Sequence, residues 1–211
     1  MGYLYEILIW AVPTVLAITL HEAAHGYAAK CYGDTTALSM GRVTLNPLAH
    51  VDAIGTVLVP VVLLVFTHGT ALFGWAKPVP INPRNFRPFK EGFLVVSAAG
   101  CIANLLQGLA WTLALKLLVW TGLATQTVAA VCCAGVFVNF CLLGFNLIPL
   151  PPLDGGRILT LFLPWRLSSL FVEFERYGML VLAVLIVSGF LNFWLHPFMS
   201  AAHNLLTFAA M

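Results

Sequence analysis

Long apolar runs dominate the order of hydrophobic and polar residues along the chain. A helix needs about 20 apolar residues to cross the hydrocarbon core of a bilayer. Segments of this length occur at roughly 4–29, 92–120, 127–148 and 177–196. The remaining stretch at the C-terminus, 197–211, is too short to span fully and is expected at the membrane interface. The pattern predicts an all-α polytopic membrane protein with about four spanning helices.

Composition supports this class. Of the 211 residues, 61% are hydrophobic and 9% are charged, whereas a soluble domain carries about 25% charged residues. The net charge of +2 is small and scattered, which argues against nucleic-acid binding. The N-terminus has no basic region followed by a cleavage site, so the first apolar segment is expected to remain as a spanning helix. With no repeat, linker or polar domain visible, residues 1–211 are expected to form a single membrane-embedded domain.

Two polar connections differ from the rest. Residues 30–50 mix β-branched residues with turn formers. Residues 74–91 contain Pro78 and Pro80, which favour extended backbone before them. We expect these connections to form short membrane-associated β-strands or extended loops at one membrane face.

The first apolar segment carries ionisable residues. His21-Glu22-Ala23-Ala24-His25 is an H-E-x-x-H motif. On a helix, its two histidines share one face and can offer two nitrogens to one metal ion. The glutamate can then act as general base toward a metal-bound water. Because ionisable groups at membrane depth are costly and functional by default, we interpret the motif as a metal site rather than as interfacial histidines at a helix end.

A catalytic zinc site usually takes three protein ligands and leaves a fourth position open. The candidates for the third ligand are His50, His68, His196, His203, Asp34, Asp52, Glu91, Asp154, Glu173 and Glu175. Asp154 stands out because it follows a proline-rich stretch that breaks the preceding helix. Irregular backbone at membrane depth is tolerated only where it is buried within the protein or lines a water-filled cavity. Gly155 and Gly156 would let another element approach closely. The alternative role of Asp154 is to cap the next helix.

Together, His21-Glu22-x-x-His25 and Asn146-Leu-Ile-Pro-Leu-Pro-Pro-Leu-Asp154-Gly-Gly resemble the motifs of the site-2 protease family of intramembrane zinc metalloproteases, peptidase family M50. The spacing is similar to that of the minimal bacterial branch, and the resemblance covers nearly the whole chain. It implies one Zn²⁺ held by His21, His25 and Asp154, with Glu22 activating water. It also implies that the substrate is a transmembrane segment of another protein.

The chain differs from the family pattern in two respects. It has no segment that could form a PDZ or CBS domain, so substrate selection by such modules is not expected. Where relatives often read Ala-Gly-Pro in the middle helix, it has Ala99-Gly100-Cys101, and no role is carried over to Cys101. Asn104 in the same helix is a candidate substrate-binding group, or else a residue of helix packing.

Two further sets of residues are candidates for contact with the substrate. The carboxamide of Asn146 could bind the substrate carbonyl or oxyanion as a catalytic group, or it could satisfy backbone groups freed by the prolines after it. The extended stretch could pair with an unwound substrate and replace the hydrogen bonds lost from its helix, or it could serve as an interfacial anchor. Its candidate substrate-binding residues are Gly74, Trp75, Ala76 and Lys77.

The motifs also constrain the topology. His21 lies near the C-terminal end of the first helix, and Asp154 follows the C-terminal end of the 127–148 helix. These helices must run in the same direction if the two residues are to meet, so the interrupted apolar segment 51–73 is predicted to re-enter rather than to span. Nearly all cations of the connections then share one face, which the positive-inside rule makes cytoplasmic. We expect a multi-pass protein of the bacterial inner membrane with its active site toward the cytoplasm.

The favoured function is an intramembrane zinc endopeptidase that cuts peptide bonds within or near transmembrane segments of other proteins, in regulated intramembrane proteolysis. A zinc transporter or sensor could use the same ligands, but it would not need Glu22. An inactive scaffold that binds membrane helices is the third possibility, and the intact Glu22 argues against it. The expected partners are the bilayer and a transmembrane protein substrate, with no nucleic acid.

Overall fold

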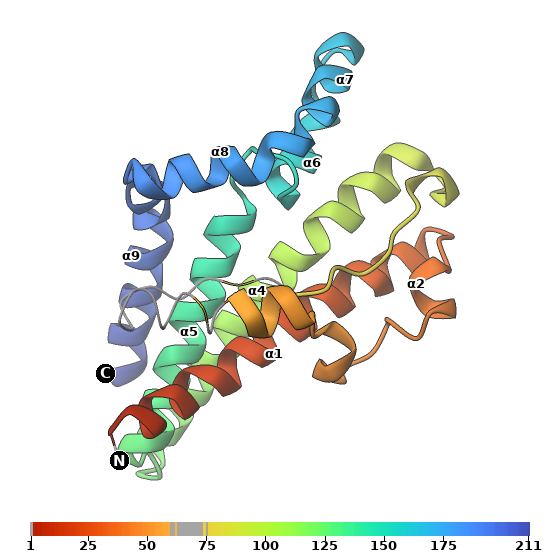
Figure 1. Ribbon diagram of the computed structural model, residues 1–211. Helices are drawn as coiled ribbons and strands as arrows, with labels where there is room; N and C mark the ends of the chain where they lie inside the picture. Colours follow the sequence, from red (N-terminus) through yellow and green to blue (C-terminus); the bar gives the residue numbers. More distant parts are fainter. Residues whose placement is uncertain (1, 60–61, 63–73, 75) are drawn as a thin grey trace.

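The computed structural model describes residues 2–59, 62, 74 and 76–211, which form mainly helices (Figure 1). Three helices are long and apolar enough to cross a membrane: α1 (Gly2–Cys31), α4 (Phe89–Trp120) and α5 (Gln126–Asn146). The C-terminal third forms α6 (Asp154–Thr160), α7 (Trp165–Glu173), α8 (Glu175–Val187) and α9 (Phe190–Ala210). Short elements between α1 and α4 are α2 (Thr36–Ser39), η1 (Pro47–His50), η2 (Ala53–Leu58) and η3 (Pro83–Asn85).

Helices α1 and α5 run in the same direction. The Tyr5 hydroxyl lies 3.1 Å from the Thr127 hydroxyl, so the first turns of the two helices are neighbours. At the other end, Asp154 follows α5 and lies beside His25 of α1. Helix α4 is antiparallel to α1, because the carbonyl of Val96 near its start contacts His25 near the end of α1. The parallel arrangement that the motifs require is therefore present.

The connection from α1 to α4 leaves and returns at one end of the helix bundle, since these two helices are antiparallel. Within it, the described part of the predicted re-entrant segment consists of η2 and the residues next to it. Most of the segment 51–73 lies outside the described residues, so its path across or into the membrane stays a prediction.

The predicted span at 177–196 is not one helix. Helix α8 ends at Val187 and α9 begins at Phe190, and the two are bent by 79°. Gly189 between them has a φ of +77°, which glycine adopts without steric cost. Residues of the expected interfacial stretch 197–211 instead extend α9, which accommodates Pro197 within it. Helices α8 and α9 form a fourth candidate span only if the two bent helices are taken together as one crossing of the membrane.

The predicted β-strands are a second correction, since no strand is assigned among the described residues. The segment 76–82 is extended, but its polar groups bond to side chains and loops rather than to a neighbouring strand. The N–H of Val79, for example, donates to the Glu22 carboxylate. Pro78 and Pro80 have no N–H to contribute to a ladder.

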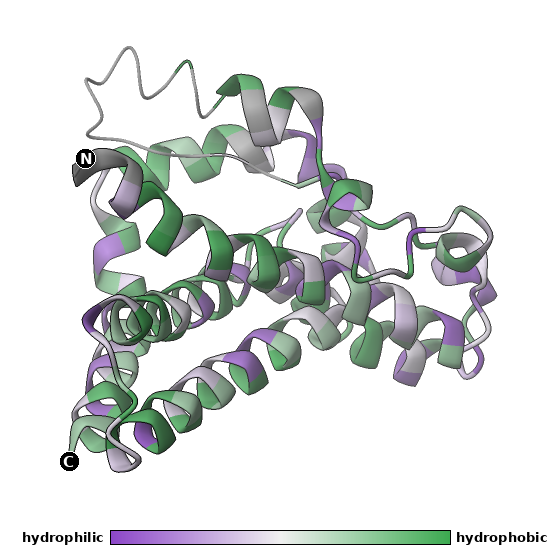
Figure 2. Cartoon of the chain, turned by 90° about the horizontal axis from the view of Figure 1, so that it is seen from below, coloured by the Kyte–Doolittle hydropathy of each residue, from purple (hydrophilic) through white to green (hydrophobic). Residues whose placement is uncertain are grey.

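Small residues let α4 and α5 approach each other closely. A methyl group at Gly108 would lie 2.7 Å from the Phe140 ring, and one at Gly135 would lie 2.5 Å from the Trp111 ring. Tight packing of this kind is what holds helices together in lipid, where the surroundings are as apolar as the side chains. The outer faces carry exposed apolar residues such as Leu106. Hydrophobic residues are frequent along the helices of the chain (Figure 2).

Candidate metal centre

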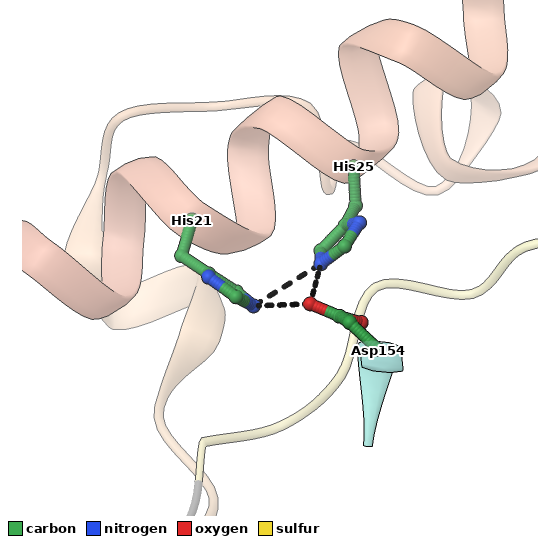
Figure 3. A group of neighbouring side chains, drawn as sticks. All are labelled: His21, His25 and Asp154. Carbon is green, nitrogen blue, oxygen red and sulfur yellow. Dashed lines mark hydrogen bonds and ion pairs between the residues drawn. The ribbon is translucent and has the colours of Figure 1, made fainter. Parts of the chain in front are cut away.

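Helix α1 places two imidazoles on the face that packs against α4, where they also meet the first residue of α6. His21 and His25 are both buried, and their Nε2 atoms lie 3.1 Å apart. Asp154, the first residue of α6, brings its Oδ2 atom to 3.4 Å from His21 Nε2 and 3.3 Å from His25 Nε2 (Figure 3). Three donor atoms from distant parts of the chain thus converge on one buried point.

The donor set fits a zinc ion. The three ligand atoms lie within 4.8 Å of one another. His21 Nδ1 lies 2.9 Å from the Asn104 side-chain oxygen, and His25 Nδ1 lies 2.7 Å from the Val96 carbonyl oxygen. Because carbonyl oxygens only accept hydrogen bonds, each Nδ1 carries the proton and each Nε2 keeps its lone pair for a metal. Two imidazoles and one carboxylate form a common donor set of catalytic zinc.

The approach of α4 to the two histidines depends on Gly100. A methyl group there would lie 2.4 Å from both His21 Cε1 and His25 Nε2, so only glycine leaves room for the imidazoles. The next residue, Cys101, places its Sγ atom 3.7 Å from Asp154 Oδ2. No role at the site was predicted for Gly100, although the run of small residues Ser97-Ala98-Ala99-Gly100-Cys101 was a signal that another element approaches α4 closely there.

Asp154 is held in place by the loop before it. Residues 147–151 fold back over the first turn of α6. A methyl group at Gly155 would lie 2.4 Å from the Leu147 carbonyl oxygen, and one at Gly156 would lie 2.4 Å from the Leu150 carbonyl carbon. The expected close approach is confirmed, and the approaching element is this loop. No side-chain cap is assigned to α6, and the Asp154 carboxylate faces the histidines instead.

Glu22 lies beside the metal-ligand candidates and is half-buried. Its Oε2 atom accepts a hydrogen bond from the Val79 N–H at 2.8 Å. This contact fastens the extended segment to α1 next to the two histidines. One carboxylate oxygen of Glu22 is therefore oriented by the backbone of a segment 57 residues away in the sequence.

A cleft of about 300 Å³ opens beside this arrangement. Its wall includes Val79, whose N–H binds Glu22, and Val96, whose carbonyl contacts His25. The rest of the lining is Ile81, Pro83, Phe86, Phe93, Ser97, Pro151, Arg157, Thr160, Val172 and Glu175. The cleft is mostly apolar and reaches the residues that contact Glu22 and His25, although none of His21, Glu22, His25 and Asp154 is part of its lining.

The other predicted site residues lie in different surroundings. Asn104 is fully buried and bonds to the His21 ring rather than facing an open space. The Asn146 amide donates to the Leu142 carbonyl one turn earlier in α5. Contact of Asn146 with a substrate stays a prediction.

The predicted substrate-binding stretch is only partly described. Gly74 and Ala76 line a second cavity, of about 270 Å³, against α1. The N–H of Lys77 donates to the His50 carbonyl at 2.9 Å. Trp75 lies outside the described residues. The role of this stretch in substrate binding stays a prediction.

Comparison with known proteins decides the family. The sequence signature of Peptidase family M50 matches residues 118–189, which include Asp154. The chain is 34% identical over 198 residues to "Putative zinc metalloprotease YwhC" of Bacillus subtilis (strain 168), covering 92% of this chain and 86% of that protein. The chain belongs to peptidase family M50.

A more distant relative supports the assignment. Rip2 of Mycolicibacterium smegmatis (strain ATCC 700084 / mc(2)155), which carries the same description, is 29% identical over 184 residues, covering 85% of this chain and 67% of that protein. No solved structure matches the chain. With its three long apolar helices, this M50 peptidase family member is a multi-pass membrane protein.

Proposed function

We propose that this M50 family member is a zinc metalloprotease that hydrolyses peptide bonds within or near transmembrane segments of other membrane proteins. The observation that carries the proposal is the convergence of His21, His25 and Asp154 beside Glu22, on a helix apolar enough to span a membrane. The names of the relatives support the metalloprotease part. The position of the site within apolar helices supports a membrane-embedded substrate, as regulated intramembrane proteolysis requires.

The residues present account for the chemistry. His21, His25 and Asp154 would hold one zinc ion, which when bound supplies Lewis-acid activation of water and of the peptide carbonyl. Glu22 takes the proton from the attacking water and then delivers it to the leaving nitrogen. Because Val79 holds Oε2 of Glu22, the other carboxylate oxygen is left for this proton.

The proposal extends to location. Cations gather at the end of the bundle where α1 ends and α4 begins, with Lys30, Arg84 and Lys90 among them. The positive-inside rule places such an end in the cytoplasm. We therefore infer an orientation in a bacterial inner membrane with the site toward the cytoplasm, and a single domain that contains all of the catalytic residues.

The decisive test substitutes the base. Glu22→Gln keeps the size and polarity of the side chain, so zinc should remain bound while cleavage of a model transmembrane substrate falls by about 10²-fold or more. Glu6→Gln is the matched control, because Glu6 is an exposed carboxylate on the same helix. A zinc transporter or a helix-binding scaffold would keep its function in the Glu22→Gln variant. Undiminished cleavage would exclude the mechanism.

A further inference from the structure

A buried cation lies next to the extended segment. Arg42 follows α2 and is only 8% exposed. Among the described residues, no carboxylate lies within 4.0 Å of its guanidinium group. A buried charge without a counter-charge is costly. The position of Arg42 therefore calls for an explanation in terms of what the guanidinium binds.

The guanidinium binds the backbone that reaches Glu22. Arg42 Nη2 donates to the Lys77 carbonyl at 2.7 Å and to the Pro78 carbonyl at 3.3 Å. The Pro78 carbonyl and the Val79 N–H belong to one peptide group, and that N–H donates to Glu22 Oε2 at 2.8 Å. A single peptide group thus joins the cation to the carboxylate.

This arrangement transmits orientation. A peptide group is planar, so a donor that holds its oxygen also sets the direction of its N–H. A cation at the carbonyl polarises the group and strengthens the hydrogen bond that its N–H donates. The segment is fastened on its other side too, because the Lys77 N–H donates to the His50 carbonyl at 2.9 Å. Rotation of the 77–79 backbone away from Glu22 would break several of these bonds together.

We propose that Arg42 is a positioning residue for Glu22. Its guanidinium holds the backbone of residues 77–79, and the Val79 N–H in turn holds one oxygen of the Glu22 carboxylate, so that the other oxygen meets the attacking water. The inference rests on the proposed function of Glu22 as the general base. It gives Arg42 a role in the chemical step although its side chain touches no metal-ligand candidate.

Kinetics provide the first test, in purified full-length protein with a model transmembrane substrate. Arg42→Gln should lower kcat by about 10- to 100-fold, since small misplacements of a reacting group have effects of this size. Zinc content should stay at the wild-type level, and KM should change less than kcat, because the base is displaced while the metal site and most of the cleft lining remain. Arg42→Lys should recover part of kcat. Arg84→Gln, which removes an exposed cation of η3 in the same connection between α1 and α4, should match wild type.

Hydrogen exchange provides a readout that does not depend on activity. The amides of Lys77 and Val79 should exchange about 10-fold faster in Arg42→Gln than in wild type, and at the wild-type rate in Arg84→Gln. Unchanged exchange, or an unchanged kcat, would overturn the role of Arg42. Wild type that fails to cleave, or Glu22→Gln that still cleaves, would instead refute the proposed function.

A second pair of variants tests the same link if Arg42→Gln fails to fold or to retain zinc. Val79→Pro removes the N–H at the other end of the same link, whereas Val79→Ala keeps it. The proposal requires a fall in kcat in Val79→Pro relative to Val79→Ala, with zinc retained in both. Equal kcat values in these two variants would overturn the proposal as well.

Discussion

The Nδ1 atom of His21 lies 2.9 Å from the side-chain oxygen of Asn104, a residue of α4 with no exposure to solvent. Histidines that bind metals almost always donate their second ring N–H to such a partner, which sets the tautomer and the ring orientation. Asn104 thus acts on the site through His21. Its burial explains why the structure shows this contact rather than the substrate-facing position considered from the sequence.

Replacement of Asn104 by Leu should weaken zinc binding by about 10- to 100-fold, because the imidazole loses its orienting partner. Competition with a chelator of known affinity measures the change. Asn104→Asp keeps an acceptor and should stay close to wild type. Thr112→Val, which alters a buried polar residue bonded only within α4, is the control. Equal zinc affinity in Asn104→Leu and Thr112→Val would contradict the assignment.

A methyl group at Gly100 should disrupt the metal centre. In Gly100→Ala the new carbon would lie 2.4 Å from atoms of both histidines, so zinc content and cleavage should both be lost. Gly108→Ala puts the same group against the Phe140 ring of α5, at 2.7 Å. That control should lower thermal stability but retain zinc at the wild-type stoichiometry. Normal zinc content in Gly100→Ala would show that α4 can move away from the histidines without harm.

Metal analysis tests the ligand set directly. Purified wild-type protein should contain one zinc per chain, and Asp154→Ala should lose it, because two imidazoles alone hold zinc weakly. Removal of zinc with a chelator should abolish cleavage, and added zinc should restore it. Glu173→Ala, at an exposed carboxylate of α7, should keep its zinc. Full zinc occupancy after Asp154→Ala would remove Asp154 from the site.

Asp34 should make the stability of the protein depend on pH. Burial opposes its ionisation, but hydrogen bonds from Thr36, the Asn82 N–H and the Asn85 amide outweigh burial and hold the pKa of Asp34 below its usual value. The stabilisation is complete above the unfolded-state pKa of about 3.9 and is lost as the pH falls through the lower folded-state pKa.

Asp34→Asn should therefore lower the free energy of unfolding at pH 7 by about 1.5–3 kcal/mol, the usual range for hydrogen bonds to a charged group. Thermal unfolding in detergent, followed from about pH 3 to about pH 7, measures the effect. The gap between wild type and variant should close below about pH 4. A gap that stays constant over this range would exclude Asp34 as its source.

Labelling of single cysteines tests the topology. All five cysteines lie among the described residues, and none of them forms a disulfide there. They can therefore be replaced without breaking a disulfide among these residues. Single cysteines near Gly41 and near Asn85, which are both exposed, should react with an impermeant thiol reagent from the cytoplasmic face. Antiparallel α1 and α4 require the two positions to share a face. Labelling from opposite faces would mean that the segment 51–73 spans the membrane.

Much of the architecture could be predicted from local pattern. Length and apolarity located the three long helices, because the bilayer imposes a minimum span on any sequence. The spacing of His21 and His25, and the break before Asp154, indicated which residues would meet. That pairing in turn required α1 and α5 to be parallel. Each of these conclusions depends on residues close together in sequence or on a constraint that the membrane imposes.

Other features were decided by the tertiary structure alone. The bend at Gly189 depends on the backbone angle of a single residue, which an average of hydropathy over a window cannot register. The links from Asn104 to His21 and from Arg42 through the Pro78–Val79 peptide join positions far apart in sequence. The sequence determined which groups could bind a metal and move a proton, because residue type carries that chemistry. Packing decided which distant donor and acceptor orient them, because such partners are selected by where the folded helices bring the backbone.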